Sequence, residues 1–497
     1  MSTPTSRDLF CFDNSYARNL NGFYVPWKPA AVSAPRMLRF NDTLARELGL
    51  ETQALNSAYG ARIFSGTEIV AGSEPLAQAY AGHQFGGFVP ELGDGRAVLL
   101  GEVIDLQGHR RDIALKGSGR TPFSRGGDGK AAVGPMLREY IIGEAMQALG
   151  IPTTRALAVV STGEDVIREQ ILPGAVLARV AASHVRVGTF QYFAARGDID
   201  KVRTLAEYVI DRHDPDLARR PDRYLALLRA VALRQARLIA QWMLNGFIHG
   251  VMNTDNMAIS GETIDYGPCA FMEAYTPRAV FSSIDRQGRY AYGNQPAIAQ
   301  WNLARFAETL LPLIAPEDPD RAVPAATGVL QMFVEGYESH WLSGMRAKLG
   351  LQEAAEGDRE LANDWLTLLE AQNVDFVLAW RRLGDAAAGN VKSLDELFRD
   401  GRTLGDWIDR WRIRAAQESI DAEARKEAMH RVNPLYIARN HRVEEALAAA
   451  SDRSDLKLFE RLLEVIANPF EERPELEIYA QPASPEVTAS YKTFCGT

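Results

Sequence analysis

The chain has 497 residues, enough to bury one large or two medium hydrophobic cores, so we expect a two-lobed enzyme. Its formal net charge of −9 argues against a protein that binds nucleic acid or an anionic membrane nonspecifically. The sequence has no apolar run long enough to cross a bilayer, and its N-terminus lacks the apolar core of a signal peptide. We therefore expect a cytoplasmic protein with neither nucleic acid nor membrane as a partner.

The cysteines are Cys11, Cys269 and Cys495. They are too few for a disulfide framework, and their spacing does not match that of a zinc site. The spacing leaves open whether Cys495, near the end of the chain, is inert or a redox partner of one of the others.

The N-terminal part predicts one helix followed by several strands. Residues 35–48 carry leucines near one helical face and a proline at the start, which indicates a helix. Strands are expected at 97–100, 112–116, 156–160 and 166–170. The first of these strands follows a Gly-Asp-Gly turn, and a Thr-Gly turn joins the last two.

Lys116 ends the strand at 112–116 and leads directly into a glycine-rich segment. A helix at 135–149 follows, with Glu139 in its early turns. The order strand, lysine, helix, glutamate is typical of the small lobe of kinase-like enzymes, where a Lys–Glu ion pair places the lysine on phosphate. The alternatives are a solvated lysine and a glutamate that serves only the helix dipole. Glycine-rich backbone beside the lysine favours the phosphate role.

A second glycine cluster ends in Gly129-Lys130-Ala131. It is not a Walker A loop, because alanine follows the lysine and no glycine stands at the required upstream position. Further along, Arg179 and Arg186 offer guanidinium groups that match phosphate oxygens from a second side. The alternative for these two arginines is a pair of surface salt bridges.

The second half of the chain is predicted to be helical. A helix at 222–245 carries a core-facing apolar stripe and leads into the stretch 249–267. Periodic segments that we interpret as scaffold helices lie at 301–311, 325–349, 358–383 and 404–428, and a helix start is expected at 433–440.

The stretch 249–267, HGVMNTDNMAISGETIDYG, carries the residues that a metal and a nucleotide phosphate need. In a β-hairpin, the Asn256 amide and the Asp265 carboxylate would share a hard cation, and Asp255 would accept a proton. The alternative is a hairpin loop capped by Asx residues. His249 is interpreted as an orienting or core histidine rather than the base.

Five long segments together resemble one known family. They are PLAQAYAGHQFGGFVPELGDGRAVLLGEV, DIALKGSGRTPFSRGGDGKA, LREYIIGEAMQALGIPTTRALAVV, NTDNMAISGETIDYGPCAFM and NPLYIARN. In this order they resemble the selenoprotein O (YdiU) family of kinase-like proteins, essentially from Phe12 to Cys495. The resemblance implies an α+β, bilobal, protein-kinase-like fold. We place a β-rich small lobe at 1–178 and a mostly helical large lobe at 179–497.

The resemblance also implies an activity and a set of site residues. Members transfer AMP from ATP, bound in a flipped orientation, to a Ser, Thr or Tyr hydroxyl of a protein, and pyrophosphate leaves. Asp255 corresponds to the proposed base, and Glu139 to the partner of Lys116. Asn256 and Asp265 correspond to the ligands of Mg²⁺, with Mn²⁺ as the alternative metal. The residues placed around the nucleotide are Gly93, Gly95, Arg96, Lys116, Asp128, Gly129, Arg179, Arg186 and Asp265.

Two other functions stay open at the level of the sequence. A kinase-like phosphotransferase would use the same groups, and a noncatalytic ATP-binding pseudokinase would act as a scaffold. The joint presence of a base and two metal ligands speaks against the scaffold. A monomer is favoured, and the resemblance suggests a regulatory disulfide between Cys269 and Cys495.

Overall fold

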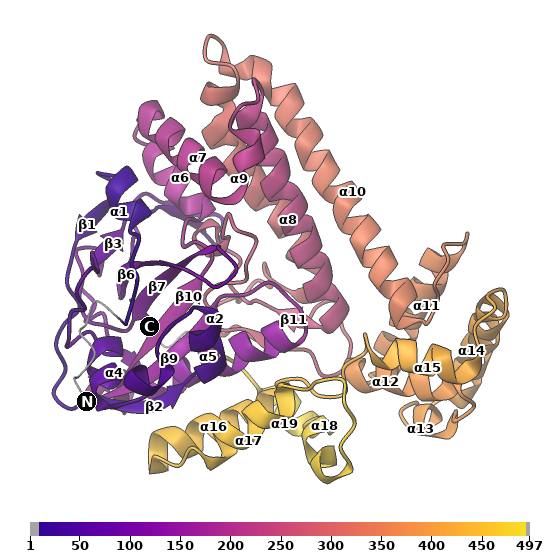
Figure 1. Cartoon of the computed structure of the whole chain (residues 1–497). Helices are drawn as coiled ribbons and strands as arrows, with labels where there is room; N and C mark the ends of the chain where they lie inside the picture. Colours follow the sequence, from indigo (N-terminus) through magenta and orange to yellow (C-terminus); the bar gives the residue numbers. More distant parts are fainter. Residues whose placement is uncertain (1–8, 494–497) are drawn as a thin grey trace.

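The computed structural model describes residues 9–493. Its N-terminal part is rich in antiparallel sheet and its C-terminal part is helical (Figure 1). The α+β class expected from the sequence is therefore confirmed. Within residues 9–493, no helix is both long enough and apolar enough to cross a membrane.

The main sheet has the strand order β1-β3-β6-β7-β10-β9-β2, with β8 also paired to β10, and its neighbours are antiparallel. Its strands are β1 (Tyr24–Pro26), β2 (Arg36–Phe40), β3 (Leu76–Gln78), β6 (Ala97–Ile104), β7 (Arg110–Lys116), β8 (Ala131–Ala132), β9 (Arg155–Ile167) and β10 (Ile171–Ala181). Two small hairpin sheets pair β4 (Gly82–Gln84) with β5 (Gly87–Val89) and β11 (Phe247–Ile248) with β12 (Ala270–Phe271).

The two faces of the main sheet are covered by different helices. Along β10, Ala175 and Leu177 belong to the core on the side of α5 (Val133–Ala148), whereas Val176 and Ala178 belong to a second core. That second core is closed by the short helices α2 (Asp42–Glu47), α3 (Thr52–Leu55) and α4 (Ala58–Phe64). Successive side chains of a strand point to opposite faces, so β10 is buried on both sides.

The helix predicted at 35–48 is wrong in its first half. Residues 36–40 form β2, which pairs with the edge of β9, and Asn41 then caps α2 by accepting a hydrogen bond from Leu44 N (3.1 Å). Pairing with a distant strand overrides the local helical pattern, because strand formation depends on such neighbours more than on intrinsic preference.

The two strands predicted at 156–160 and 166–170 are also corrected. A single strand, β9, runs through both the first segment and the Thr-Gly pair, and the chain turns at 168–170 before β10. Gly163 has a φ of +71° and lies where the register between β9 and β10 shifts. The glycine therefore marks a bulge within a strand rather than a turn between two strands.

Helix α8, which confirms the helix predicted at 222–245, packs against α7, α9 and α10. Besides α1 (Ser15–Asn19), the remaining helices are α6 (Val187–Ala194), α7 (Ile199–His213), α8 (Arg223–Asn245), α9 (Gln295–Ile314), α10 (Val323–Lys348), α11 (Asp358–Gln372), α12 (Phe376–Ala387), α13 (Lys392–Asp395), α14 (Gly401–Ala415), α15 (Ala422–His430), α16 (Asn440–Arg453), α17 (Lys457–Ile466), α18 (Glu477–Ala480) and α19 (Pro485–Ser490). Helix α10 runs along α8, helices α11 to α15 extend away from the sheet, and α16 and α17 lie against α5 (Figure 1).

Two of the predicted scaffold segments and the expected helix start differ in detail. The segment 358–383 is broken at Asn373, whose φ of 57° is left-handed and ends α11. The segment 404–428 is broken between α14 and α15, where Asp421 caps the second helix. The helix expected to start within 433–440 begins only at Asn440, so the preceding residues are irregular.

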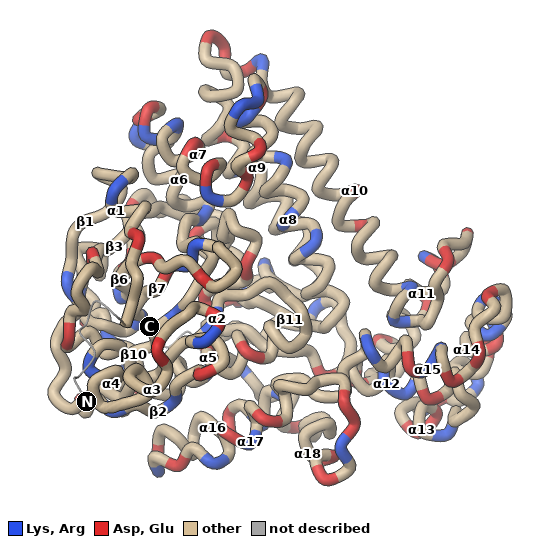
Figure 2. Tube along the Cα trace, viewed as in Figure 1, with Lys and Arg blue, Asp and Glu red and all other residues tan. Residues whose placement is uncertain are grey.

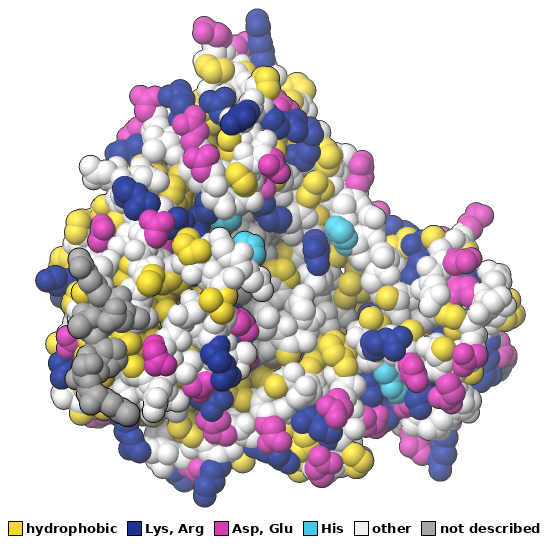
Figure 3. Space-filling model, viewed as in Figure 1, with side chains coloured by type: hydrophobic (Ala, Val, Ile, Leu, Met, Phe, Trp, Pro, Cys, Tyr) yellow, Lys and Arg dark blue, Asp and Glu magenta, His cyan; other side chains and the backbone are white. Residues whose placement is uncertain are grey.

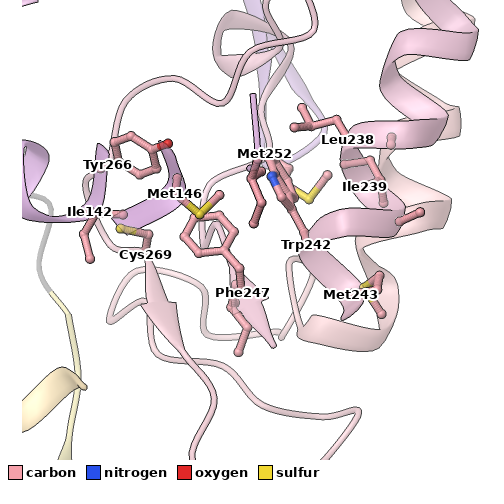
Figure 4. Packing of buried hydrophobic residues seen from close by; sticks show 14 of the residues in the cluster. Ile142, Met146, Leu238, Ile239, Trp242, Met243, Phe247, Met252, Tyr266 and Cys269 are labelled. Atoms are coloured by element: carbon pink, nitrogen blue, oxygen red, sulfur yellow. The ribbon is translucent and has the colours of Figure 1, made fainter. Parts of the chain in front are cut away.

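The end of α8 is anchored in the main core. Gly246 ends the helix in a left-handed conformation (φ 68°), and Trp242 packs against Phe247 at a ring distance of 5.4 Å. Figure 4 shows Phe247 surrounded by side chains from α5, α8 and the segment after Tyr266. Phe247 also pairs with Phe271 across β11 and β12. Both ends of the stretch 249–267 are thereby held in the core.

The stretch 249–267 is not itself the β-hairpin that we predicted. The paired strands β11 and β12 lie outside it, and within it residues 254–256 form one turn of 3₁₀ helix. Isolated bridges join Ala258 to Arg186 and Thr263 to Thr153. The stretch is therefore an irregular segment that neighbouring elements support. Its polar side chains need not alternate between two faces, as they would in a strand.

Charged side chains of both signs occur along most helices (Figure 2) and are interspersed over the face shown in Figure 3. Cys11 is an exposed free thiol, and Cys269 is buried. Cys495 lies outside the described residues, so its predicted pairing with Cys269 stays a prediction.

Candidate active site

Lys116 and Arg179 extend from the same face of the main sheet. In the antiparallel register of β7 and β10, Lys116 stands opposite Leu177 and Arg179 opposite Ala114. Leu177 and Ala114 both belong to the core beneath α5, so the two cations share that face. Lys116 is 5% exposed and Arg179 3% exposed, which excludes a solvated surface role for either.

Lys116 binds two carboxylates that come from different parts of the chain. Its Nζ donates to Glu139 on α5 and, at 2.6 Å, to Asp265 Oδ1. Arg179 Nη1 lies 3.9 Å from the second oxygen of Glu139. The ion pair expected between Lys116 and Glu139 is therefore present in the structure, and Glu139 contacts the lysine from helix α5.

Asp265 is the carboxylate on which the cations converge. It accepts from Arg179 Nη1 at 2.5 Å and from Arg186 Nη1 at 3.5 Å, in addition to Lys116. Burial raises its pKa, but the positive charges of Arg179, Lys116 and Arg186 outweigh burial and hold that pKa well below its usual range. Asp265 is therefore ionised, and its φ of 63° places it in a backbone region that Asp tolerates better than most residues.

Asp255 has a different environment although it lies in the same cavity. Its Oδ2 accepts from Gln84 Nε2 at 3.2 Å, whereas its Oδ1 is buried and has no hydrogen-bond partner among residues 9–493. Burial raises the pKa of Asp255 to about 6. A Cβ at Gly82 would overlap this carboxylate, so the β4–β5 hairpin can approach Asp255 closely only because glycine stands there.

Asn256 follows Asp255 in the 3₁₀ turn. Its Nδ2 donates to Val251 O at 3.0 Å, which leaves the amide oxygen on the opposite side of the group. Arg186 is 2% exposed, and its Nη1 also donates to the backbone oxygen of Asp255 at 3.0 Å. The guanidinium of Arg186 lies 4.4 Å from the centre of the Tyr80 ring. These contacts fix the turn against the arginine.

Two glycine-rich loops form the other wall of the cavity. Gly117 N donates to Arg96 O at 2.7 Å, which ties the first loop to the end of β7. Gly129 has a φ of +68°, and a Cβ there would overlap the carbonyl oxygen of Gly119. Arg168 holds the second loop by donating to both oxygens of Asp128 (2.9 and 3.0 Å). Close backbone packing of this kind needs glycine.

The site residues predicted from the sequence lie together around one cavity of about 640 Å³, a size typical of small-molecule sites. Those that line it are Gly93, Gly95, Arg96, Lys116, Asp128, Gly129, Arg179, Arg186, Asp255, Asn256 and Asp265. Glu139 lies behind Lys116. What each residue does there stays a prediction.

His249 lies outside this cavity. It is fully buried, its Nε2 is 2.9 Å from Ile264 O, and its ring stacks on Trp242. Burial lowers its pKa, so the ring is neutral. The interpretation of His249 as a core histidine agrees with this position.

Four further residues of the site were not singled out from the sequence. Tyr80, Gln84 and Arg168 line the cavity: Arg168 falls within the strand predicted at 166–170, and Tyr80 and Gln84 fall within the glycine-rich segment. His184 lies between Arg179 and Arg186 in the sequence and contacts Arg179. Each of these residues is polar and lies inside an otherwise apolar or glycine-rich motif, which could have marked it as a candidate. Its hydrogen-bond partner, however, depends on how the strands and loops align in the folded protein.

Comparison with known proteins assigns the chain to a family. The family model described as Protein adenylyltransferase SelO matches residues 9–467. The chain belongs to this family. The resemblance stated from the sequence is thereby confirmed, and the chain is an enzyme, a protein adenylyltransferase.

Individual members of the family cover nearly the whole chain. A protein nucleotidyltransferase YdiU of Cereibacter sphaeroides is 61% identical over 489 residues, which cover 98% of this chain and 100% of the relative. Proteins with the same name from Chromobacterium violaceum (62% over 474 residues, 95% and 99% covered) and Rhizobium rhizogenes (59% over 488 residues, 98% and 97% covered) are equally similar. The match therefore includes both the sheet and the helical part.

Proposed function

We propose that this enzyme transfers AMP from ATP to a Ser, Thr or Tyr hydroxyl of a protein and releases pyrophosphate. The observation that carries the proposal is the buried carboxylate of Asp255, which lines the same cavity as Lys116, Arg179 and Arg186 and whose Oδ1 has no hydrogen-bond partner among residues 9–493. A carboxylate oxygen without a partner is suited to accept a proton, and the three cations are suited to a triphosphate.

The reaction needs a base and a set of fixed charges. The acceptor oxygen attacks the α-phosphorus and forms the new P–O bond, and the bond to the oxygen that bridges to the β-phosphate breaks. Pyrophosphate leaves with the electron pair, and Asp255 takes the hydroxyl proton. Lys116 and the two arginines offset the charge of the phosphates, so most of the catalysis is positioning and electrostatics.

Asn256 and Asp265 would hold Mg²⁺, or alternatively Mn²⁺. One carboxylate and one amide oxygen fit a hard cation that is usually bound by one or two carboxylates together with substrate phosphates. When bound, the metal would neutralise charge on the phosphates and on the leaving pyrophosphate. Asp265 is ionised beside its cations, which suits it to this role.

The two glycine-rich loops are proposed to cradle the nucleotide. Gly93, Gly95 and Arg96 lie on one loop, and Asp128 and Gly129 on the other. Backbone N–H groups of glycine-rich segments approach phosphate oxygens closely. The flipped orientation of ATP, with the α-phosphate toward the acceptor, rests on family membership, as do the small lobe at 1–178 and the large lobe at 179–497.

One labelling experiment tests the proposal. The protein is incubated with Mg²⁺, a mixture of candidate acceptor proteins and ATP labelled at either the α- or the γ-phosphate. Protein-bound label from the α-phosphate alone, with pyrophosphate released, is the expected result. Transfer of the γ label would instead identify a phosphotransferase, and tight ATP binding without any transfer would identify a scaffold.

A further inference from the structure

A buried chain of hydrogen bonds connects Arg179 with helix α7 along one face of the sheet. Arg179 Nε donates to His184 Nε2 at 3.2 Å, and His184 Nδ1 lies 2.9 Å from Asp112 Oδ2. On the other side of the carboxylate, Arg212 donates to Asp112 Oδ1 at 2.5 Å and to Glu102 Oε1 at 2.6 Å. Asp112, Arg179 and His184 are all at most 3% exposed.

The donor and acceptor roles in this chain follow from chemistry. A guanidinium group only donates, so His184 Nε2 must accept from Arg179. The proton of the neutral imidazole then stands on Nδ1 and is donated to Asp112. The backbone N–H of His184 donates to the same carboxylate oxygen at 2.8 Å, so the residue is held at two points. This arrangement fixes both the tautomer and the orientation of the ring.

The charges around His184 favour the neutral ring. Burial, together with the positive charges of Arg179 and Arg186, lowers the pKa of His184 to about 4 against the opposing effect of Asp112. Burial raises the pKa of Asp112, but Arg212 and His184 outweigh it and keep this carboxylate ionised. The ring therefore stays an acceptor toward Arg179.

The hydrogen bond to His184 determines how the Nη1 end of Arg179 is placed beside the cavity. With Nε anchored on His184, the plane of the guanidinium is set, and Nη1 is directed to Asp265 Oδ1 at 2.5 Å beside the cavity. We propose that His184, oriented by Asp112, is a positioning residue that holds the Arg179 guanidinium for the phosphates of the nucleotide. This inference rests on the proposed role of Arg179, and partners that orient a ligating or catalytic group commonly affect binding about 10–100-fold.

Three variants test the inference by ATP affinity, measured by calorimetry without an acceptor protein. His184→Leu removes the acceptor and should raise the Kd for ATP about tenfold. His184→Gln keeps an oxygen for Arg179 and an N–H for Asp112, and should stay within about threefold of the wild type. His213→Leu is the matched control, because His213 is a half-buried imidazole next to Arg212 whose buried Nε2 has no hydrogen-bond partner among residues 9–493. It should leave the Kd unchanged.

A double-mutant comparison separates this inference from the proposed function. Arg179→Met removes both the charge and the Nε donor and should weaken ATP binding, and His184→Leu should then add little in that background. If Arg179→Met does not change ATP binding, the role of Arg179 in the proposed function is wrong. If Arg179→Met weakens binding but His184→Leu does not, only the positioning role of His184 is overturned.

A measurement on the wild-type protein covers the case in which His184→Leu does not fold. Nitrogen-15 NMR of histidine-labelled protein, with the resonances of His184 assigned through His184→Gln, should show a protonated Nδ1 and an unprotonated Nε2 at pH 7. A proton on Nε2 would contradict the hydrogen bond from Arg179 and overturn the inference.

Discussion

Two buried arginine clusters in this protein have opposite balances of charge. At the cavity, Lys116, Arg179 and Arg186 converge on Asp265, with Glu139 as a second carboxylate. In the helical part, the fully buried Arg439 donates to two carboxylates, Glu273 at 2.6 Å and Asp375 at 2.6 and 3.0 Å. The first cluster has an excess of cations and the second an excess of acids.

The difference teaches how to separate a binding cluster from a structural one. Arg439 also donates to Ala480 O at 2.8 Å, so it joins the segment after β12, the start of α12 and the end of α18, and the chain encloses it. The cations at Asp265 instead line an open cavity. An excess of positive charge beside a cavity suits an anionic ligand, whereas an enclosed, acid-rich cluster fixes elements to one another.

The largest effect is expected at the convergent carboxylate of the first cluster. Asp265→Ala should reduce the transfer of α-label by about 10³-fold or more, because both the metal ligand and the partner of the cations are lost. Transfer by the purified variant is compared with that of Asp214→Ala, which breaks an aspartate–arginine pair outside the cavity. Retained transfer in Asp265→Ala would refute the metal assignment.

At the second cluster we expect a loss of stability with little loss of transfer. Arg439→Met leaves two buried carboxylates without their cation and should lower the free energy of unfolding by about 3–5 kcal/mol. Urea denaturation measures this change, and transfer per folded molecule should stay near that of the wild type. Arg442→Met is the control: it lies three residues further along, in α16, and pairs with Glu445 near the surface, so it should change stability by less than about 0.5 kcal/mol. A loss of transfer without a loss of stability in Arg439→Met would contradict the structural role.

A smaller effect on catalysis is expected from a single cation of the first cluster. Lys116→Ala should lower transfer about 10²-fold while Arg179 and Arg186 continue to hold the phosphates. Lys130 also follows a glycine-rich loop, but it is 40% exposed at its side chain and pairs with Glu164, so Lys130→Ala is the matched control. Equal losses in the two variants would show that proximity to the glycine loops, rather than the buried ion pair, decides the effect.

The sequence predicted the cavity better than it predicted the supporting contacts. Lys116, Asp255 and Asp265 stand out because their residue types and neighbours are those that phosphate and metal chemistry needs, and all three line the cavity. Arg439 falls within the helix start expected at 433–440. Its ion pairs are not predicted, because its partners Glu273 and Asp375 are distant in sequence. A hydrogen-bonded hub of this kind is visible only once the fold brings its members together.

The errors in secondary structure have the same cause. Residues 36–40 form a strand because β9 offers them an edge, and Gly163 becomes a bulge because β10 continues the pairing beyond it. The local pattern contains neither partner. The same limit applies to His184, whose role depends on the register that places Arg179 and Asp112 on either side of its ring.

The smallest effect tests a third kind of buried cation. Lys348 is 4% exposed and has no ion pair among residues 9–493, and its Nζ lies over the rings of Trp380 (5.0 Å) and Phe376 (5.9 Å). Burial lowers its pKa to about 7 from an ordinary value of 10.5. Lys348→Met should therefore raise the free energy of unfolding by about 1–2 kcal/mol at pH 7, since an unpaired buried charge costs more than an apolar side chain.

The difference in the free energy of unfolding between Lys348→Met and the wild type should depend on pH. Between pH 7 and 10.5 the unfolded chain holds one more proton at Lys348 than the folded chain, so the wild type gains stability as the pH rises. The advantage of Lys348→Met should accordingly shrink from pH 7 toward pH 10, as followed by urea denaturation at each pH. Lys392→Met, at an exposed lysine, should show no such trend. A constant difference across this range would mean that Lys348 is charged throughout in the folded protein, and that its two aromatic neighbours offset the burial of the ammonium group.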